Sequence, residues 1–169
     1  RAGVGIGSLY EYFSGKESLL GVLIGRITER NFQSLLASLD SRPDSSLADT
    51  VGHMAEATAQ TYLGSPKLTK VVITTVVRLG LMGVVVQERD RFAAELALRA
   101  KRFFPNASEE ALRRSMEIIA DSSMGVVMAE LTRAAEPDVA RSGRELSELA
   151  LAVLCSRHEL VPSSSGSRA

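Results

Sequence analysis

Apolar residues recur every three or four positions along most of this chain, the spacing that places them on one face of an α-helix. The repeat is clearest over residues 17–39, where leucine and isoleucine dominate, and over residues 47–63. Signals for strands are scarce, because no stretch alternates steadily between apolar and polar residues and no Asn-Gly or Asp-Gly pair predicts a hairpin. The pattern predicts an all-α fold.

Polar caps and prolines divide this pattern into separate helices. Ser14 and Glu17 have the spacing of a capping box, which satisfies two free amides at a helix start, and Ser142 and Glu145 repeat it. Ser108 stands directly before another apolar run, where its hydroxyl can cap a helix. After one short helix near the N-terminus, we therefore expect six longer helices, over residues 14–39, 47–63, 66–79, 84–104, 109–134 and 142–158.

The longest apolar stretch covers residues 71–86. It is too short to span a bilayer, and Arg78 and two glycines interrupt it, so we expect it to lie in a protein core. No apolar segment typical of a signal peptide follows Arg1. Residues 161–169 are rich in Ser, with Pro and Gly, and we expect them to form a disordered tail.

Charge and cysteine content exclude some classes of protein. Twenty basic and twenty acidic side chains balance, which argues against a protein coated in basic charge but leaves room for a local nucleic-acid contact. The one cysteine, Cys155, cannot form an internal disulfide and suits the cytoplasm, where we expect the protein to lie. Because Cys155 falls within an apolar helical pattern, we expect it to be buried as a small hydrophobic residue.

Residues 5–13 have the pattern of a short helix with two different faces. Leu9 and Phe13 lie four residues apart and share a face that packs inward. Ser8 and Tyr12 share the opposite face, and their hydroxyls can donate to phosphates or to base edges, as can that of Tyr10. The pattern favours a helix that enters the major groove of DNA. A packing tyrosine and a solvated lysine remain the structural alternatives for Tyr10 and Lys16.

The same segment resembles the signature of the TetR family of transcriptional regulators. The match has no gap, covers about a ninth of the chain, and includes twelve residues: Ala2, Gly3, Val4, Gly7, Leu9, Tyr10, Tyr12, Phe13, Lys16, Glu17, Leu19 and Leu20. The resemblance implies a homodimeric DNA-binding regulator, most often a repressor that a small-molecule ligand releases from a palindromic operator. It also implies which residues contact double-stranded DNA: Gly5, Ile6, Gly7, Ser8, Tyr10, Tyr12 and Lys16.

Two positions depart from the family pattern. Gly5 stands where Ser or Thr usually caps the reading helix, and glycine offers no side-chain bond there. Ile6 stands where a polar residue is usual, which leaves an apolar contact to a thymine methyl or local packing. In the family the domain begins roughly 30 to 45 residues earlier, with two further helices. The resemblance therefore implies that residues 1–40 are the C-terminal part of a helix-turn-helix domain with its connecting helix, followed by a helical regulatory domain over residues 41–160.

Within that second domain the middle helices are the place where we expect a ligand pocket. The candidates mix bulky apolar groups with a few hydrogen-bonding ones: Met54, Thr58, Tyr62, Arg78, Phe92, Phe103, Met116 and Met124. Ordinary core packing is the alternative for each of these residues. Arg78 is the most informative of these candidates, because an arginine in an apolar run needs an acidic partner, solvent or an anionic ligand.

The last two expected helices have broad apolar faces and small residues among them, which suits a four-helix bundle between two chains. Packing within one chain is the alternative for these faces. A dimer would place two reading helices at the spacing of a palindrome.

Catalytic and cofactor signatures are not found. His53 and His158 lie far apart, and neither belongs to a zinc-ligand or nucleophile–base pattern. No phosphate-binding loop or dinucleotide fingerprint occurs. The sequence therefore predicts neither an enzyme nor a cofactor. The alternative to a regulator is a helical ligand-binding or protein-interaction module that does not bind DNA.

Overall fold

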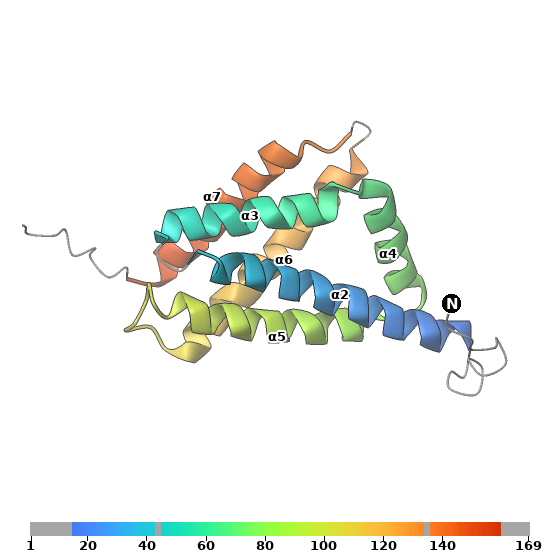
Figure 1. Cartoon of the computed structure of the whole chain (residues 1–169), viewed down its shortest axis with the longest axis horizontal. Coiled ribbons are helices and arrows are strands. Elements are labelled where there is room, and N and C mark those ends of the chain that lie inside the picture. The colour runs from blue at the N-terminus through green and yellow to red at the C-terminus, as the bar shows by residue number, and fades with distance from the viewer. Residues whose placement is uncertain (1–14, 43–44, 134–135, 160–169) are drawn as a thin grey trace, which may run out of the picture.

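The computed structural model describes residues 15–42, 45–133 and 136–159, which form six helices and no strand (Figure 1). The predicted all-α fold is confirmed for this part of the chain. The helices are α2 (Lys16–Asp40), α3 (Leu47–Leu63), α4 (Pro66–Arg78), α5 (Met82–Ala100), α6 (Glu109–Thr132) and α7 (Val139–Arg157).

The helices pack in two groups that share α6. The most extensive contact joins α3 to α7, and the next joins α5 to α6. The long helix α2 lies between α3 and α5, whereas the short helix α4 stands across one end of the molecule (Figure 1). The second half of α2 belongs to this body, because Leu35 and Leu36 form a buried cluster with Phe92 of α5.

Serine side chains cap the starts of α3 and α6. The hydroxyls of Ser46 and Ser108 accept from the amides of Asp49 and Ala111, so the cap predicted at Ser108 is confirmed. No side-chain cap is found at the start of α2, where Gly15 is the N-cap residue and Ser14 lies outside the described residues.

The capping box expected at Ser142 is wrong. The last helix begins three residues earlier, at Val139, and Asp138 caps it by accepting from the amide of Arg141. Ser142 is fully buried inside the helix, next to Gly143. A Cβ atom on Gly143 would lie 3.4 Å from the Cα atom of Glu56, so small residues are needed here because α7 crosses closely over α3.

The apolar run over residues 71–86 is not one buried segment. The chain turns at Gly80, whose φ of 64° lies in the left-handed region, and α4 and α5 meet at 117°. The bend leaves Val71 and Val77 largely exposed, at 62% and 65%, while Val76 is buried. The expectation of a core location therefore holds for only part of the run. No single helix among the described residues has the length and apolar composition to cross a membrane, although the bent pair α4 and α5 would pass that test together.

A large cluster of buried residues lies where α5, α6 and α7 meet the turn after α5. Phe104 and Leu112 are completely buried there, and Ala93 and Ala97 allow the helices to approach. Cys155, in contrast, is exposed, so its predicted burial is wrong. Leu154 and other residues on the inner face of α7 fill the core instead.

Candidate ligand-binding pocket

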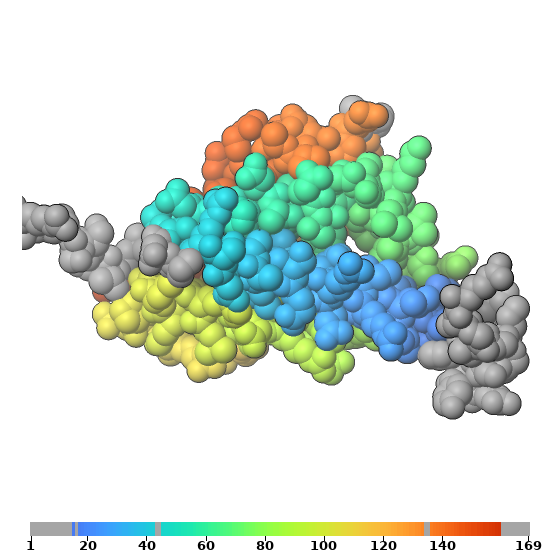
Figure 2. Space-filling model, viewed as in Figure 1, coloured from blue at the N-terminus to red at the C-terminus, as the bar shows by residue number. Residues whose placement is uncertain are grey.

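A cavity of about 580 Å³ lies between α2, α3, α4, α5 and α6, and three residues of α7 also line it: Leu146, Ala150 and Leu154. This volume is typical of pockets that hold small molecules. The surface is hollowed between α2 and α4 in the space-filling view (Figure 2). Several lining side chains at this end are partly exposed, including Val77 of α4, Met82 and Val86 of α5, and Met128 of α6. These apolar residues edge an opening through which a small molecule could enter.

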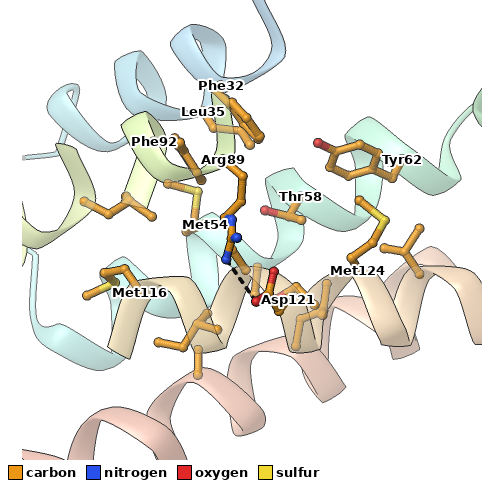
Figure 3. Close-up of a pocket in the computed structure, with 18 of the residues that line it drawn as sticks. Phe32, Leu35, Met54, Thr58, Tyr62, Arg89, Phe92, Met116, Asp121 and Met124 are labelled. Atoms are coloured by element: carbon orange, nitrogen blue, oxygen red, sulfur yellow. Dashed lines mark hydrogen bonds and ion pairs between the residues drawn. The ribbon is translucent and has the colours of Figure 1, made fainter. Parts of the chain in front are cut away.

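Six of the eight predicted pocket residues line this cavity: Met54, Thr58, Tyr62, Phe92, Met116 and Met124. They come from three helices, α3, α5 and α6, and Figure 3 shows them around a common space. These residues lie far apart in the sequence, and the packing of α3 and α5 against α6 brings them together. That a ligand occupies this space stays a prediction.

Arg78 and Phe103 do not line the cavity. Arg78 is the last residue of α4 and is exposed to solvent, so it needs no buried partner. Phe103 lies in the turn after α5, where its ring packs beside the main core and beneath the guanidinium of Arg102, 4.5 Å from the ring centre. The two predictions fail for different reasons. Helix α5 ends at Ala100, before the predicted limit of residue 104, whereas Arg78 is exposed at the end of α4, just before the bend at Gly80.

Arg89 is one of three arginines that line the cavity, with Arg99 and Arg102, and sequence reasoning missed it. Its side chain is only 21% exposed, and its Nη1 atom donates to Oδ2 of Asp121 over 2.9 Å (Figure 3). Its Nε atom lies 3.0 Å from Oδ1 of Asp90, an ion pair without the alignment of a hydrogen bond. The signal was present in the sequence, since Arg89 shares a helical face with Phe92 and Leu96 at spacings of three and seven residues.

Two hydroxyl groups of α3 point into the same space. Thr58 and Tyr62 lie one helical turn apart, and Figure 3 shows both oxygens directed toward the side where Arg89 stands. Among the described residues neither hydroxyl has a hydrogen-bond partner. Burial raises the pKa of Tyr62 to about 12, so its hydroxyl keeps its proton at neutral pH and can donate or accept.

Aromatic stacking joins α2 to the cavity wall. The rings of Phe32 and Phe92 lie 4.4 Å apart between centroids and 8° from parallel. Phe32, Thr28 and Leu35 all line the cavity, so the second half of α2 faces the space in which a ligand would lie. This contact is the direct physical link between the cavity and the helix that follows residues 1–14.

An ion-pair cluster lies at the other end of the cavity wall, where α2 and α5 both end. Arg99 donates from Nε and Nη2 to the two carboxylate oxygens of Asp40, each over 2.8 Å, and it also pairs with Glu95. The bond from Arg99 lowers the pKa of Asp40 below its ordinary value. The charges at this end are therefore matched within the protein.

One serine–histidine contact exists outside the cavity. The hydroxyl of Ser115 lies 2.9 Å from Nε2 of His158, and this histidine also packs beside the ring of Phe104. Ser115 is fully buried and also donates to the carbonyl of Ala111, so a substrate has no access to its oxygen. The pair attaches the end of α7 to α6. Burial, with a smaller effect of Arg157, lowers the pKa of His158 below its ordinary value.

The residues expected to contact DNA are not tested by this geometry. Gly5, Ile6, Gly7, Ser8, Tyr10 and Tyr12 lie outside the described residues, and α2 begins at Lys16. In the described part of the chain, no group of three or more His, Cys, Asp and Glu side chains could hold a metal ion.

Comparison of the chain with models of known protein families, with curated proteins and with solved structures gives no match. The resemblance of residues 2–20 to the TetR signature therefore stays a prediction that rests on the sequence alone.

Proposed function

We propose that this protein is a TetR-like transcriptional regulator that represses its target genes and leaves its operator when a small molecule binds. The observation that carries the proposal is the gapless match of residues 2–20 to the family signature. A cavity among the middle helices supports it, because a ligand-responsive regulator needs a binding site separate from its DNA contacts.

The response to ligand is proposed to pass through α2. This helix follows the segment with the DNA-reading pattern and contributes Thr28, Phe32 and Leu35 to the cavity wall. A ligand that fits the cavity better in one position of α2 would favour that position and change the spacing of two reading helices. The ligand must prefer one of the two states, since equal affinity for both would shift nothing.

A homodimer is part of the proposal, with α6 and α7 of each chain at the interface. Small and exposed side chains on both helices support it, among them Gly125 and Ala129 of α6 and Ala152 of α7. Small residues let two helices from different chains approach closely. Two chains related by a twofold axis would then read the two halves of a palindrome.

The experiment is a DNA-binding assay with the protein expressed from its complete reading frame and a fragment from upstream of its own gene. We expect binding that weakens steeply as salt rises, because phosphate contacts release counterions. Tyr12→Ala should reduce operator binding about tenfold or more, on the scale of one or two lost polar contacts to DNA. A folded Tyr12→Ala protein that binds the operator as the wild type does would contradict the role given to Tyr12.

A second function is favoured by the cavity together with the balanced charge of the chain. A helical ligand-binding or protein-interaction module would need the pocket but no basic surface. The same assay separates the two functions, because the module would bind small molecules and show no affinity for DNA at any salt concentration.

A further inference from the structure

The lining is mainly apolar, and its charged groups lie in two places. Arg99 and Asp40 pair with each other where α2 and α5 end, whereas Arg89 and Asp121 stand near the hydroxyls of α3. Thr58 and Tyr62 direct their hydroxyls to the side of the cavity where Arg89 meets Asp121 (Figure 3). Around them most of the lining is aliphatic, aromatic or methionine, including Met54, which lies beside Arg89 in the same view. A ligand that fits this space is therefore apolar over most of its surface and polar at one position.

The charges at this position are already matched within the protein. The guanidinium of Arg89 has Asp121 on one side and Asp90 on the other, at 2.9 and 3.0 Å. An anionic ligand would add a third negative group near one cation. A cationic ligand would have to compete with Arg89 for Asp121, whose carboxylate is already paired and is 65% exposed to solvent. Both kinds of charged ligand are thus at a disadvantage against an uncharged one.

The two hydroxyls, in contrast, are unmatched. Both residues are partly exposed, and their hydroxyls face the cavity with their hydrogen-bonding capacity unused, so a ligand oxygen that reaches them can form a new hydrogen bond. Thr58 and Tyr62 lie one turn apart on the rigid helix α3, so one ligand oxygen can meet both. Each hydroxyl donates one hydrogen and accepts others, which suits either a carbonyl or a hydroxyl group of the ligand.

We propose that the cavity binds an uncharged, mainly apolar molecule with a carbonyl or hydroxyl oxygen, and that Thr58 and Tyr62 hydrogen-bond to this oxygen. The inference rests on the proposed function, because it names the chemical class of the effector to which the regulator responds. The pair formed by Arg89 and Asp121 stays intact in the complex and selects against charged ligands.

Three probes with the same ten-carbon chain test the charge selection: decan-1-ol, decanoate and decyltrimethylammonium. Each is used below its micelle concentration to displace the fluorescent tracer N-phenyl-1-naphthylamine from the wild-type protein. The chain contains no tryptophan, so protein fluorescence does not obscure the tracer. We expect decan-1-ol to displace the tracer at a concentration at least about tenfold lower than either ion, the scale of one unmade polar contact. An equal or stronger effect of decanoate or decyltrimethylammonium would overturn the proposal.

Conservative variants test the role of the two hydroxyls. Thr58→Val and Tyr62→Phe keep the shape of each side chain and should weaken displacement by decan-1-ol about fivefold each, after correction for the affinity of each variant for the tracer. Thr61→Val is the matched control, since this threonine is on the same helix but does not line the cavity, and its hydroxyl donates to the carbonyl of Ala57. Unchanged displacement by decan-1-ol in both cavity variants would overturn the hydrogen-bonding role.

Failure of this inference can be told from failure of the proposed function. The displacement assay contains no DNA, so a preference for decan-1-ol supports the ligand class even if no operator is bound. Conversely, operator binding that decanoate relieves and decan-1-ol does not would leave a ligand-responsive regulator but overturn the uncharged class.

Discussion

Two adjoining regions of the helical body, which meet at Met116 and Leu154, differ in how completely their side chains fill space. Around Phe104 and Leu112 the helices approach through alanines and leave these large side chains completely buried. Around Thr58 and Tyr62, between α2, α4 and α6, the same kinds of apolar side chain surround about 580 Å³ of cavity. The two regions therefore have different roles. The close-packed region stabilises the fold, and the region around the cavity leaves room for a ligand.

The contacts of α4 illustrate the region around the cavity. This helix meets α3 and α2 only over a small area, and Leu68, Val71 and Val77 remain exposed on it. In contrast, α7 crosses α3 so closely that Gly143 lies against the backbone at Glu56. Few contacts mean a smaller free energy for local opening, so α4 is the element we expect to move most easily.

The largest effect should come from removing a side chain in the packed region. Leu112→Ala should reduce the free energy of unfolding by about 2–5 kcal/mol, because it leaves an empty space that neighbours cannot fill. Leu96→Ala should cost about half as much, since Leu96 is only partly buried and borders the existing cavity. Urea denaturation of both variants measures the difference, and equal losses would show that the two regions are packed alike.

The same substitution should have opposite effects in the two regions. Ala97→Leu adds volume where the alanine is 1% exposed and should destabilise the protein by about 1–3 kcal/mol. Ala120→Leu adds the same atoms to the wall of the cavity and should be neutral or stabilising by up to about 1 kcal/mol, while weakening tracer binding. Thermal melting and tracer titration test this pair. A strong loss of stability in Ala120→Leu would contradict the presence of empty space beside Ala120.

The smallest expected effect is on the pH dependence of stability, through His158 in the packed region. Because burial lowers the pKa of His158 in the folded protein, the unfolded chain binds a proton first as the pH falls. The contribution of His158 to the free energy of unfolding is therefore complete above about pH 6.5, its ordinary pKa, and it decreases below that pH. His158→Gln keeps a hydrogen-bonding side chain near Ser115 without this titration, so its melting temperature should fall less between pH 7.5 and 5.5. Identical pH dependence in the two proteins would contradict this role.

Local signals in the sequence were sufficient for most helices. The bounds predicted for α3 agree with the structure, because Ser46 precedes it and Gly64 follows it. The cap at Ser108 was found for the same reason. At Ser142 a matching local signal failed, since Glu130 accepts from the amide of Asp138 and from the side chain of Arg141 and thus fixes an earlier helix start. That arrangement joins residues from two helices and has no local signature.

The candidate site was predicted in part, and the choice of the wrong arginine has a clear cause. Thr58 and Tyr62 lie on a helix whose ends were predicted correctly, so their shared face could be read from spacing. Arg78 was preferred to Arg89 because its neighbours in sequence are apolar, whereas Arg89 lies among charged residues. Because of the bend at Gly80, Arg89 lines the cavity and Arg78 does not. The bend exposes the end of α4 and directs a face of α5 into the cavity.

By itself the sequence determined that this chain is helical, where most helices begin and end, and which short segment carries the pattern of a DNA-reading helix. These properties depend on side chains within a few residues of one another. Only the tertiary structure decided that a cavity exists, that Arg89 pairs with Asp121 beside it, and that Cys155 faces solvent. Periodicity gives each helix an apolar face, but the volume left between several such faces depends on their crossing angles and on close contacts such as that at Gly143.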